Sequence, residues 1–247
     1  KFEKAGVKVP IYVIPQGIDP NYFHPNMAPI KTDAKEKFKF ITNATWEPRK
    51  NLRDLIIAFT QEFSRDDDVC LIVKTMSSAL SQPVKKEIEA IKARSAGARV
   101  YVKEDILPTE QLGCFYTVGN CFVLPTHGEG WGLPIFEALA CGLPVITTGY
   151  GAPNETLRDD NGEPFPGVHF VDWDEGEAKT SYVYLEGNRW AMPKIEDLRA
   201  KMRFVFENYK EEKKKALKTS EIIREKFSWD ACAVPIIERL KDIYATH

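Results

Sequence analysis

The sequence predicts an α/β fold, a Rossmann-like doubly wound parallel sheet flanked by helices. Two observations support this prediction. Between residues 38 and 148, short apolar runs of strand length alternate with amphipathic stretches of helical period, and this alternation is typical of strand–helix–strand units. One apolar run also leads through a glycine-containing loop into a helix, and loops at this position bind ligands in such sheets.

The predicted elements follow one another regularly along the chain. The first helix, for example, is expected because Leu52, Leu55, Ile56, Phe59 and Phe63 recur at helical spacing. Strands are expected at 38–43, 69–74, 99–103, 120–125 and 144–148, and helices at 51–63, 84–96, near 109–118 and at 133–141. Because parallel strands end at a common edge, ligand-binding residues are expected in the loops that follow these strands.

The chain after residue 157 has a different pattern. Residues 158–190 are rich in Asp, Glu, Gly and Pro and contain two apolar islands, at 168–173 and 181–185, so we expect a loop excursion with a small strand pair. A helix is expected at 194–209, and the basic run 211–218 is interpreted as the solvated face of a helix. Ser228 should cap a last helix, over 228–247, that Pro235 should kink.

The composition excludes several classes of protein. The 247 residues carry a formal net charge of -2, so the overall charge gives no reason to expect a nucleic-acid partner. No apolar run is long enough to cross a bilayer, and the first residues lack the features of a signal peptide. Five scattered cysteines favour a reducing compartment, which we expect to be the cytoplasm, and the four dispersed histidines predict no metal site.

The segment 124–146, LPTHGEGWGLPIFEALACGLPVI, has the strongest functional pattern. A buried strand is followed by a loop with glycines at 128, 130 and 132, and then by a helix with Pro134 at its first turn, where a missing N–H has no cost. The N–H groups and positive dipole end of that helix favour a phosphate or a polar sugar. Glu129 precedes the helix and Glu137 lies one turn inside it, so both carboxylates can face one ligand.

A second cluster follows the first predicted strand. The segment 45–51, TWEPRKN, places Arg49 and Lys50 at the start of the first helix, where positive side chains oppose the helix dipole. A bound diphosphate would reverse that cost, because fixed positive charge at the strand ends stabilises it. Lys74, after the second strand, is a further candidate for this role.

The run Glu129-Gly-Trp-Gly-Leu-Pro-Ile-Phe-Glu137 resembles the Glu-x7-Glu motif of family 4 retaining glycosyltransferases of GT-B fold. The resemblance extends over essentially the whole chain. IPQGIDPNYFHP, at 14–25, resembles the segment that crosses between the two domains of such enzymes, and FSWD, at 227–230, resembles the start of their final helix. The resemblance therefore implies an interdomain crossover at 1–25, a nucleotide-sugar-binding domain at 26–227 and a C-terminal helix at 228–247.

The resemblance also implies roles for individual residues. Glu137 would bind the nucleotide ribose, and Glu129 would stabilise charge that develops on the donor sugar. Backbone N–H groups in the loop of Gly130, Trp131, Gly132 and Leu133 would hold the sugar or the diphosphate, and Lys103 lies where the family reads the base through the main chain. One departure from the pattern is that Ala44 and Thr45 stand where the family has Gly-Arg, so one phosphate contact must come from Arg49 or Lys74.

These features predict the donor-binding, C-terminal half of a metal-independent, retaining glycosyltransferase of hexosyltransferase type. Its substrate would be a nucleoside diphosphate sugar with no further cofactor, and an N-terminal domain that this chain lacks would hold the acceptor. The alternatives are a sugar-nucleotide epimerase relative and a catalytically inactive nucleotide-sugar-binding domain. A dinucleotide-binding oxidoreductase is disfavoured, because no G-x-G-x-x-G follows the first strand. Peripheral membrane contact of a full-length enzyme is left open.

Overall fold

A computed structural model describes the chain except for residues 1, 2, 4, 77–80, 94–96, 105, 179–186 and 246–247. Six parallel strands form one sheet in the order β3-β2-β1-β4-β5-β6, which is the strand order of Rossmann-type folds. The predicted fold class is therefore confirmed. The order of the strands reverses between β1 and β4, so the topological switch point lies between these two neighbours.

The first five strands occupy the predicted segments. They are β1 (Phe38–Asn43), β2 (Val69–Lys74), β3 (Arg99–Lys103), β4 (Cys121–Leu124) and β5 (Val145–Thr148). The helices between them are η1 (Pro48–Lys50), α1 (Leu52–Glu62), α2 (Gln82–Ala93), α3 (Thr109–Tyr116) and α4 (Leu133–Ala140). A short helix, α5 (Ala152–Thr156), follows β5. The side chains of β2, β4 and β5 are buried at every position, as expected for strands covered by helices on both faces.

The prediction that residues 158–190 lie outside the main sheet is wrong for the first apolar island. Val168–Val171 forms β6 and pairs in parallel with β5 as the sixth strand of the main sheet. The small antiparallel pair consists instead of β7 (Trp173–Glu177) and β8 (Arg189–Pro193). Only Val168 and Val171 of β6 are fully buried, so this edge strand lacks the continuous apolar run that marks the inner strands. The second island, 181–185, lies outside the described residues.

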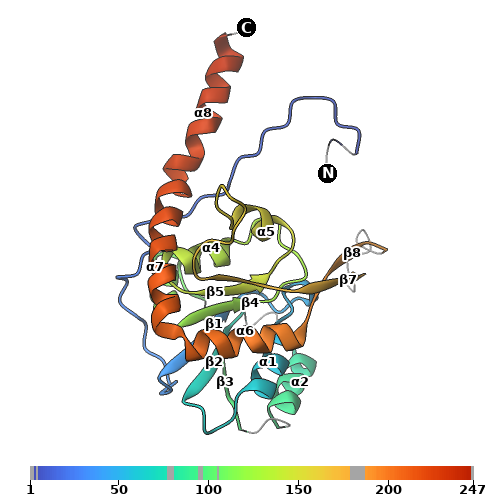
Figure 1. The fold of residues 1–247 in the computed structure, drawn as a ribbon, viewed down its shortest axis with the longest axis vertical. Coiled ribbons are helices and arrows are strands. Elements are labelled where there is room, and N and C mark those ends of the chain that lie inside the picture. Colours follow the sequence, from blue (N-terminus) through green and yellow to red (C-terminus); the bar gives the residue numbers. More distant parts are fainter. Residues whose placement is uncertain are drawn as a thin grey trace.

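Three helices complete the described fold: α6 (Ile195–Glu207), α7 (Tyr209–Lys226) and α8 (Trp229–Ala245). Helix α6 packs against α1, whereas α7 packs against α4. Figure 1 shows α6 and α7 beside the sheet. The helix predicted at 194–209 ends at Glu207, and Tyr209 begins the next helix. The expected cap of the last helix is present, because the Ala231 N–H donates to the Ser228 hydroxyl at 3.1 Å.

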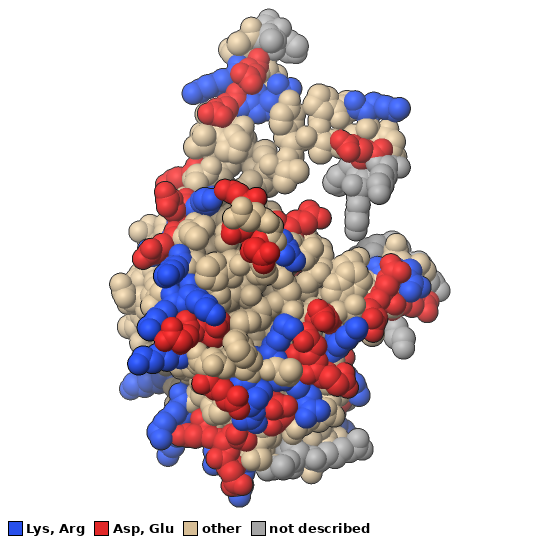
Figure 2. Space-filling model, viewed as in Figure 1, with Lys and Arg blue, Asp and Glu red and all other residues tan. Residues whose placement is uncertain are grey.

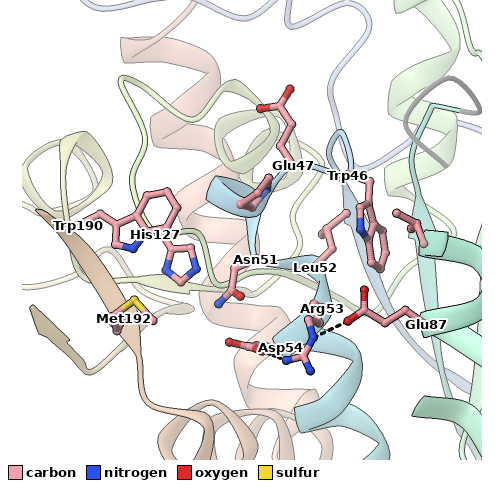
Figure 3. A pocket seen from close by; sticks show the side chains of 12 residues that line it. Trp46, Glu47, Asn51, Leu52, Arg53, Asp54, Glu87, His127, Trp190 and Met192 are labelled. Carbon is pink, nitrogen blue, oxygen red and sulfur yellow. Dashed lines mark hydrogen bonds and ion pairs between the residues drawn. The ribbon is translucent and has the colours of Figure 1, made fainter. Parts of the chain in front are cut away.

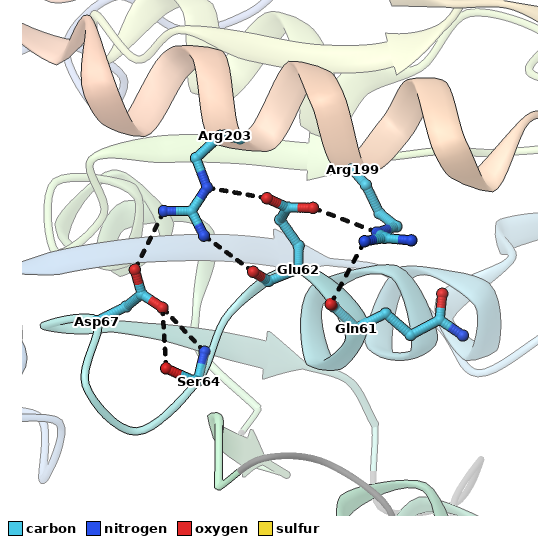
Figure 4. A network of polar contacts seen from close by, with 6 residues as sticks. All are labelled: Gln61, Glu62, Ser64, Asp67, Arg199 and Arg203. Atoms are coloured by element: carbon cyan, nitrogen blue, oxygen red, sulfur yellow. Dashed lines mark hydrogen bonds and ion pairs between the residues drawn. The ribbon is translucent and has the colours of Figure 1, made fainter.

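A network of charged groups fastens α6 to the end of α1 (Figure 4). The Arg203 guanidinium donates to the Glu62 carboxylate at 2.8 Å, to the Glu62 carbonyl at 2.9 Å and to Asp67 at 3.1 Å. It also lies 4.4 Å above the ring of Phe63. Because Arg203 makes several contacts at once and is partly buried, this cluster is worth more than an isolated surface pair.

Apolar side chains that remain exposed gather at one end of the molecule. Helix α8 and the extended segment before Gln16 project from the body on the same side (Figure 1), and the Arg239 guanidinium lies 4.8 Å above the ring of Tyr12. The exposed apolar residues of these two segments include Val9, Tyr12, Val13, Trp229, Val234, Ile237, Leu240 and Tyr244. On the body, by contrast, Figure 2 shows positive and negative side chains intermixed. Among the described residues, no helix is long and apolar enough to cross a membrane.

Candidate functional site

The loops after β1 and β4 meet at the switch point and are joined by several hydrogen bonds. The carbonyl of Arg49 accepts from the His127 N–H at 2.8 Å and from the Thr126 hydroxyl at 2.9 Å. In return, the Arg49 guanidinium donates to the Gly128 carbonyl at 2.7 Å. The two loops whose sequences predicted a binding site therefore form one structural unit.

The turn that presents Arg49 and Lys50 depends on Asn51. Its φ is 55°, in the left-handed region that few residues other than Gly and Asn adopt readily. The Asn51 side chain is buried and its Nδ2 donates to the Pro125 carbonyl at 3.1 Å. This contact fixes the turn against the end of β4, so the cationic residues that precede it are held at the edge of the sheet.

Glu129 lies between the two cations. Lys50 Nζ is 2.7 Å from Glu129 Oε1, and Arg49 NH1 is 3.1 Å from Glu129 Oε2. The Glu129 side chain is only 6% exposed and that of Lys50 only 12%, whereas that of Arg49 is 39% exposed. A carboxylate shielded from water in this way strongly attracts its partners, so the position of Lys50 is well defined.

The backbone of the glycine loop at Glu129 lies close to the backbone at Gly151, in the loop after β5. Gly132 has φ 92° and caps α4, so a side chain at this position would be strained. Gly151 has φ 72°, and a Cβ there would meet the Glu129 carbonyl oxygen at 2.9 Å. Gly130 has open space around it and an ordinary backbone conformation, so among the glycines at 128, 130 and 132 only Gly132 has a positive φ.

Glu137 lies one turn into α4 and is mostly buried. Its Oε2 accepts a hydrogen bond of 2.6 Å from the Tyr116 hydroxyl, which itself accepts from Asn43 Nδ2 at 3.2 Å. Burial raises the pKa of Glu137 above its ordinary value, while the Tyr116 hydrogen bond and the charge of Lys74 act in the opposite direction. Asn43 is the last residue of β1, so the chain of hydrogen bonds links α4 to the switch point.

A pocket of about 350 Å³ opens at the carboxyl ends of β1, β2 and β3. Lys50 and Lys74 contribute positive charge to its wall, and Pro134 marks the start of α4 beside them. The rest of its lining is mostly apolar or small: Asn43, Ala44, Thr45, Thr75, Met76, Ile106, Leu107 and Leu112. Such a wall, with two cations at one end, suits a flat apolar group joined to an anion.

The structure does not bring every predicted site residue together. Lys103 lines a separate polar pocket of about 300 Å³, with Tyr101 and Glu104. Trp131 stacks on Phe136, with ring centroids 5.1 Å apart, and fills the edge of the domain. Leu133 begins α4, and the N-cap residue Gly132 makes no side-chain cap hydrogen bond to that helix.

Two residues at the site were not predicted from the sequence. Tyr116 holds Glu137, although 21 residues separate them and nothing in the helical pattern of 109–118 distinguishes its hydroxyl. Asn43 could have been predicted from the sequence, since it is a polar residue at the end of an apolar strand, and ligands bind at the carboxyl ends of parallel strands. A search of the described residues finds no cluster of three His, Cys, Asp or Glu side chains that could hold a metal ion.

The fold and this site together define a Rossmann-type domain in which Arg49, Lys50 and Glu129 meet between two loops at the switch point. Residues 25–179, well over half of the chain, match the family described as "Glycosyl transferases group 1". The chain belongs to that family of glycosyltransferase enzymes.

Similar proteins agree with this assignment. The chain is 28% identical over 236 residues to a "Probable sucrose-phosphate synthase" of Thermosipho melanesiensis, covering 92% of this chain and 46% of that protein. A solved sucrose-phosphate synthase from Thermosynechococcus elongatus superposes with a TM-score of 0.70 at 20% identity, over 95% of this chain and 53% of that one. The solved C-terminal domain of a group 1 family protein, LpcC, from Francisella tularensis is covered completely, with a TM-score of 0.63 and 19% identity over 86% of this chain. The chain therefore spans about half the length of the full-length relatives that it matches.

Proposed function

We propose that this chain binds the nucleoside diphosphate sugar donor of a retaining, metal-independent glycosyltransferase. The observation that carries the proposal is the meeting of Lys50, Glu129 and the start of α4 at the switch point of the sheet. Cations and a helix N-terminus stabilise a diphosphate, and a carboxylate beside them faces the sugar that the diphosphate carries.

Three positive side chains are available for the diphosphate. Lys50 and Lys74 line the same pocket, and Arg49 lies 3.1 Å from the Glu129 carboxylate. Lys74 takes the place of the family's missing Arg near Thr45, because it reaches the same pocket wall from the end of β2. These fixed charges would stabilise the leaving diphosphate in place of a metal ion.

Donor binding would redistribute the contacts of Glu129. In the structure Glu129 accepts from Lys50 and lies beside Arg49. A diphosphate would compete for these two cations, and Glu129 would then face the positive charge that develops at the anomeric carbon. Glu137 would accept from the ribose hydroxyls while Tyr116 holds its other side.

A second domain would hold the acceptor. The chain spans 46% of its sucrose-phosphate synthase relative, and α8 with the extended N-terminal segment exposes apolar side chains that a further domain would cover. The five cysteines are all free, which fits our expectation of a cytoplasmic protein.

A thermal-stability screen of nucleotide sugars tests the proposal. Uridine, guanosine and adenosine diphosphates and their glucose and mannose conjugates would be added to the chain in EDTA and, separately, in Mg²⁺. We expect one base series to raise the melting temperature equally in both buffers, since ligand at a hundred times its Kd stabilises a protein by about 2.7 kcal/mol. Stabilisation only with Mg²⁺ would refute metal independence. A transfer assay on the full-length protein then separates the two remaining alternatives. Donor binding by the chain together with transfer by the full-length protein indicates an active enzyme, whereas donor binding without transfer indicates an inactive binding domain.

A further inference from the structure

A second pocket, of about 460 Å³, lies on the other side of the turn that carries Arg49 and Lys50 (Figure 3). The two pockets share this turn but use different residues of it. Ala44, Thr45 and Lys50 face the donor pocket. Trp46, Glu47, Pro48 and Asn51 face the second one. A ligand in the second pocket would therefore lie one turn of backbone away from the proposed diphosphate site.

Four further segments complete this second pocket beside the turn. Leu52, Arg53 and Asp54 come from the first turn of α1, and Val84 and Glu87 come from α2. His127 comes from the loop after β4, and Trp190 and Met192 come from β8. Figure 3 shows the lining side chains around a common space. Because β8 and α1 are far apart in the sequence, the pocket is a product of the folded domain.

The charges of the two pockets have opposite sign. The donor pocket is lined by Lys50 and Lys74 and by no carboxylate of the described chain. Three carboxylates, of Glu47, Asp54 and Glu87, line the second pocket against one guanidinium, of Arg53, which gives a formal charge of one minus three, or -2. A phosphate or a nucleotide would be repelled there, whereas a neutral ligand would not.

An apolar surface occupies much of the wall. The indole of Trp46 is half-buried near Leu52, and Met192 of β8 lies across the pocket from it (Figure 3); Val84 also lines the pocket. The face of an indole carries the negative side of the ring quadrupole, so it attracts the weakly positive C–H bonds on one face of a sugar ring. A wall of this kind binds a molecule that has both an apolar face and polar edges.

Hydrogen-bonding groups complete the wall. The ring nitrogen Nδ1 of His127 lies 2.6 Å from the Ala191 carbonyl, which can only accept, so Nδ1 carries the proton and Nε2 is an acceptor. Burial lowers the pKa of His127, which keeps the ring neutral. Trp190 stacks on that ring at 4.4 Å and is 8% exposed, and its Nε1 has no hydrogen-bond partner among the described residues. Such an unsatisfied buried N–H costs free energy that a ligand oxygen would recover.

We propose that this second pocket binds a neutral saccharide, with a sugar ring stacked on Trp46 and its hydroxyl groups on Asp54, Glu87, His127 and Trp190. Hydroxyl groups both donate and accept, which matches a wall that presents carboxylates, a ring acceptor and an N–H donor. The site lies beside the donor pocket, so an acceptor glycan and a separately bound sugar are its two sources. The proposal does not depend on the nucleotide site, because the two pockets have no lining residue in common.

Saturation-transfer NMR on the whole chain tests this proposal. The probes are glucose, mannose, sucrose and maltotriose, each with and without a saturating nucleoside diphosphate, and glucose 6-phosphate as the charged comparison. We expect transfer to at least one neutral saccharide that the diphosphate does not remove, and binding of glucose 6-phosphate that is weaker by about tenfold. Absence of transfer to every neutral probe, or full displacement by the diphosphate, would overturn the proposal; the second result would indicate a nucleobase or donor site instead.

Variants assign the signal to the pocket. Trp46→Ala should raise the Kd for the saccharide by about tenfold. Trp229→Ala, which changes an exposed tryptophan on α8, should leave that Kd unchanged. Val84→Trp fills the pocket without truncating a core side chain, so it gives the same test if Trp46→Ala fails to fold. Equal binding by wild type and both pocket variants would contradict the proposal. Lys50→Ala should weaken diphosphate binding and leave saccharide binding unchanged, and therefore failure of the donor site and failure of this pocket give different results.

Discussion

Glu129 makes close contacts with the same two cations that the proposed donor requires. Its carboxylate lies 2.7 Å from Lys50 and 3.1 Å from Arg49, so any diphosphate at this site must compete with it. Glu129 thus has opposite effects on the two parts of the donor. It opposes binding of a bare diphosphate, and it stabilises the donor sugar during transfer. Glu137 has no such competition, since the hydroxyl of Tyr116 donates its hydrogen bond to this carboxylate.

This difference predicts a split between two variants. Glu129→Ala should bind the nucleoside diphosphate as well as or better than wild type, while the ligand-free protein loses about 1–2 kcal/mol of unfolding free energy with its ion pairs. In the full-length enzyme the same change should reduce turnover by about a hundredfold or more. Glu137→Ala should weaken the diphosphate and the sugar nucleotide alike. Calorimetric titration of both variants with both ligands measures the split, and parallel losses would show that the assigned roles are wrong.

The buried Glu137 carboxyl predicts a pH effect on stability. Its pKa in the folded state is raised, chiefly by burial, so the folded protein holds this proton more tightly than the unfolded chain. The sign follows: Glu137 favours folding at low pH, and this contribution is lost as the pH rises through the raised pKa. Wild type should therefore lose stability relative to Glu137→Gln, whose amide oxygen still accepts from Tyr116, as the pH rises above about 4, the ordinary pKa of a Glu side chain. Urea unfolding of the two proteins at each pH gives the comparison, and parallel curves would contradict it.

At the scale of elements, the turn between β1 and α1 depends on one left-handed residue. Asn51 combines φ 55° with a hydrogen bond from its side chain to the Pro125 carbonyl. Asn51→Ala loses the hydrogen bond and strains the backbone, so it should cost about 2–3 kcal/mol of unfolding free energy. Asn51→Gly loses only the hydrogen bond and should cost about 1 kcal/mol less. Equilibrium denaturation ranks the two variants; the reverse order would show that the backbone conformation is not what selects Asn.

The elements that could be predicted from the sequence are those with a continuous pattern. Strands β1 to β5 consist of apolar runs, four of them almost wholly buried, and α1 shows its buried face at helical spacing. The apolar island that contains β6 was expected in a small strand pair, and its place in the main sheet was missed because this edge strand buries only its two ends. The boundary between α6 and α7 was missed because Tyr209 continues the apolar stripe across Asn208, where the chain turns.

The site was predictable as far as local spacing could define it. The loops after β1 and β4 meet because parallel strands end together, and that rule brought Lys50 and Glu129 to one place. Pairings that depend on packing between distant elements could not be predicted in this way. The bond between Tyr116 and Glu137 and the pocket between β8 and α1 both depend on how helices and the β7–β8 pair pack against the sheet.

At the scale of the whole molecule, the charge distribution places the binding sites more clearly than the net charge does. The formal net charge of -2 does not indicate where a ligand would bind. The lining residues of two neighbouring pockets, however, carry charges of opposite sign: one lining has two lysines, and the other has three carboxylates and one arginine. Figure 2 shows positive and negative side chains intermixed on the body, with uncharged surface between them. Local charge separation of this kind would direct a diphosphate and a neutral sugar to different sides of one turn.

The proposed missing domain predicts that the chain alone transfers no sugar. One domain cannot exclude water from the donor or orient an acceptor, and orientation supplies a large part of enzymatic rate acceleration. The chain should therefore bind donor but release at most traces of diphosphate, while the full-length protein turns over. Product formation from radiolabelled donor with each protein provides the measurement. Robust transfer by the chain alone would show that it is a complete enzyme.

The central claim is that a diphosphate binds at the switch point on Lys50, and one calorimetric measurement tests it most directly. The nucleoside diphosphate found by the stability screen would be titrated in EDTA into wild type, Lys50→Ala and Lys37→Ala. Lys37 is a suitable control because it also pairs with a carboxylate, of Asp68, but lies before β1 at the opposite end of the strand. We predict that Lys50→Ala weakens binding by about 1.5–3 kcal/mol, the value of a hydrogen bond to a charged group, and that Lys37→Ala binds as wild type does. Equal affinity of all three proteins would contradict the account.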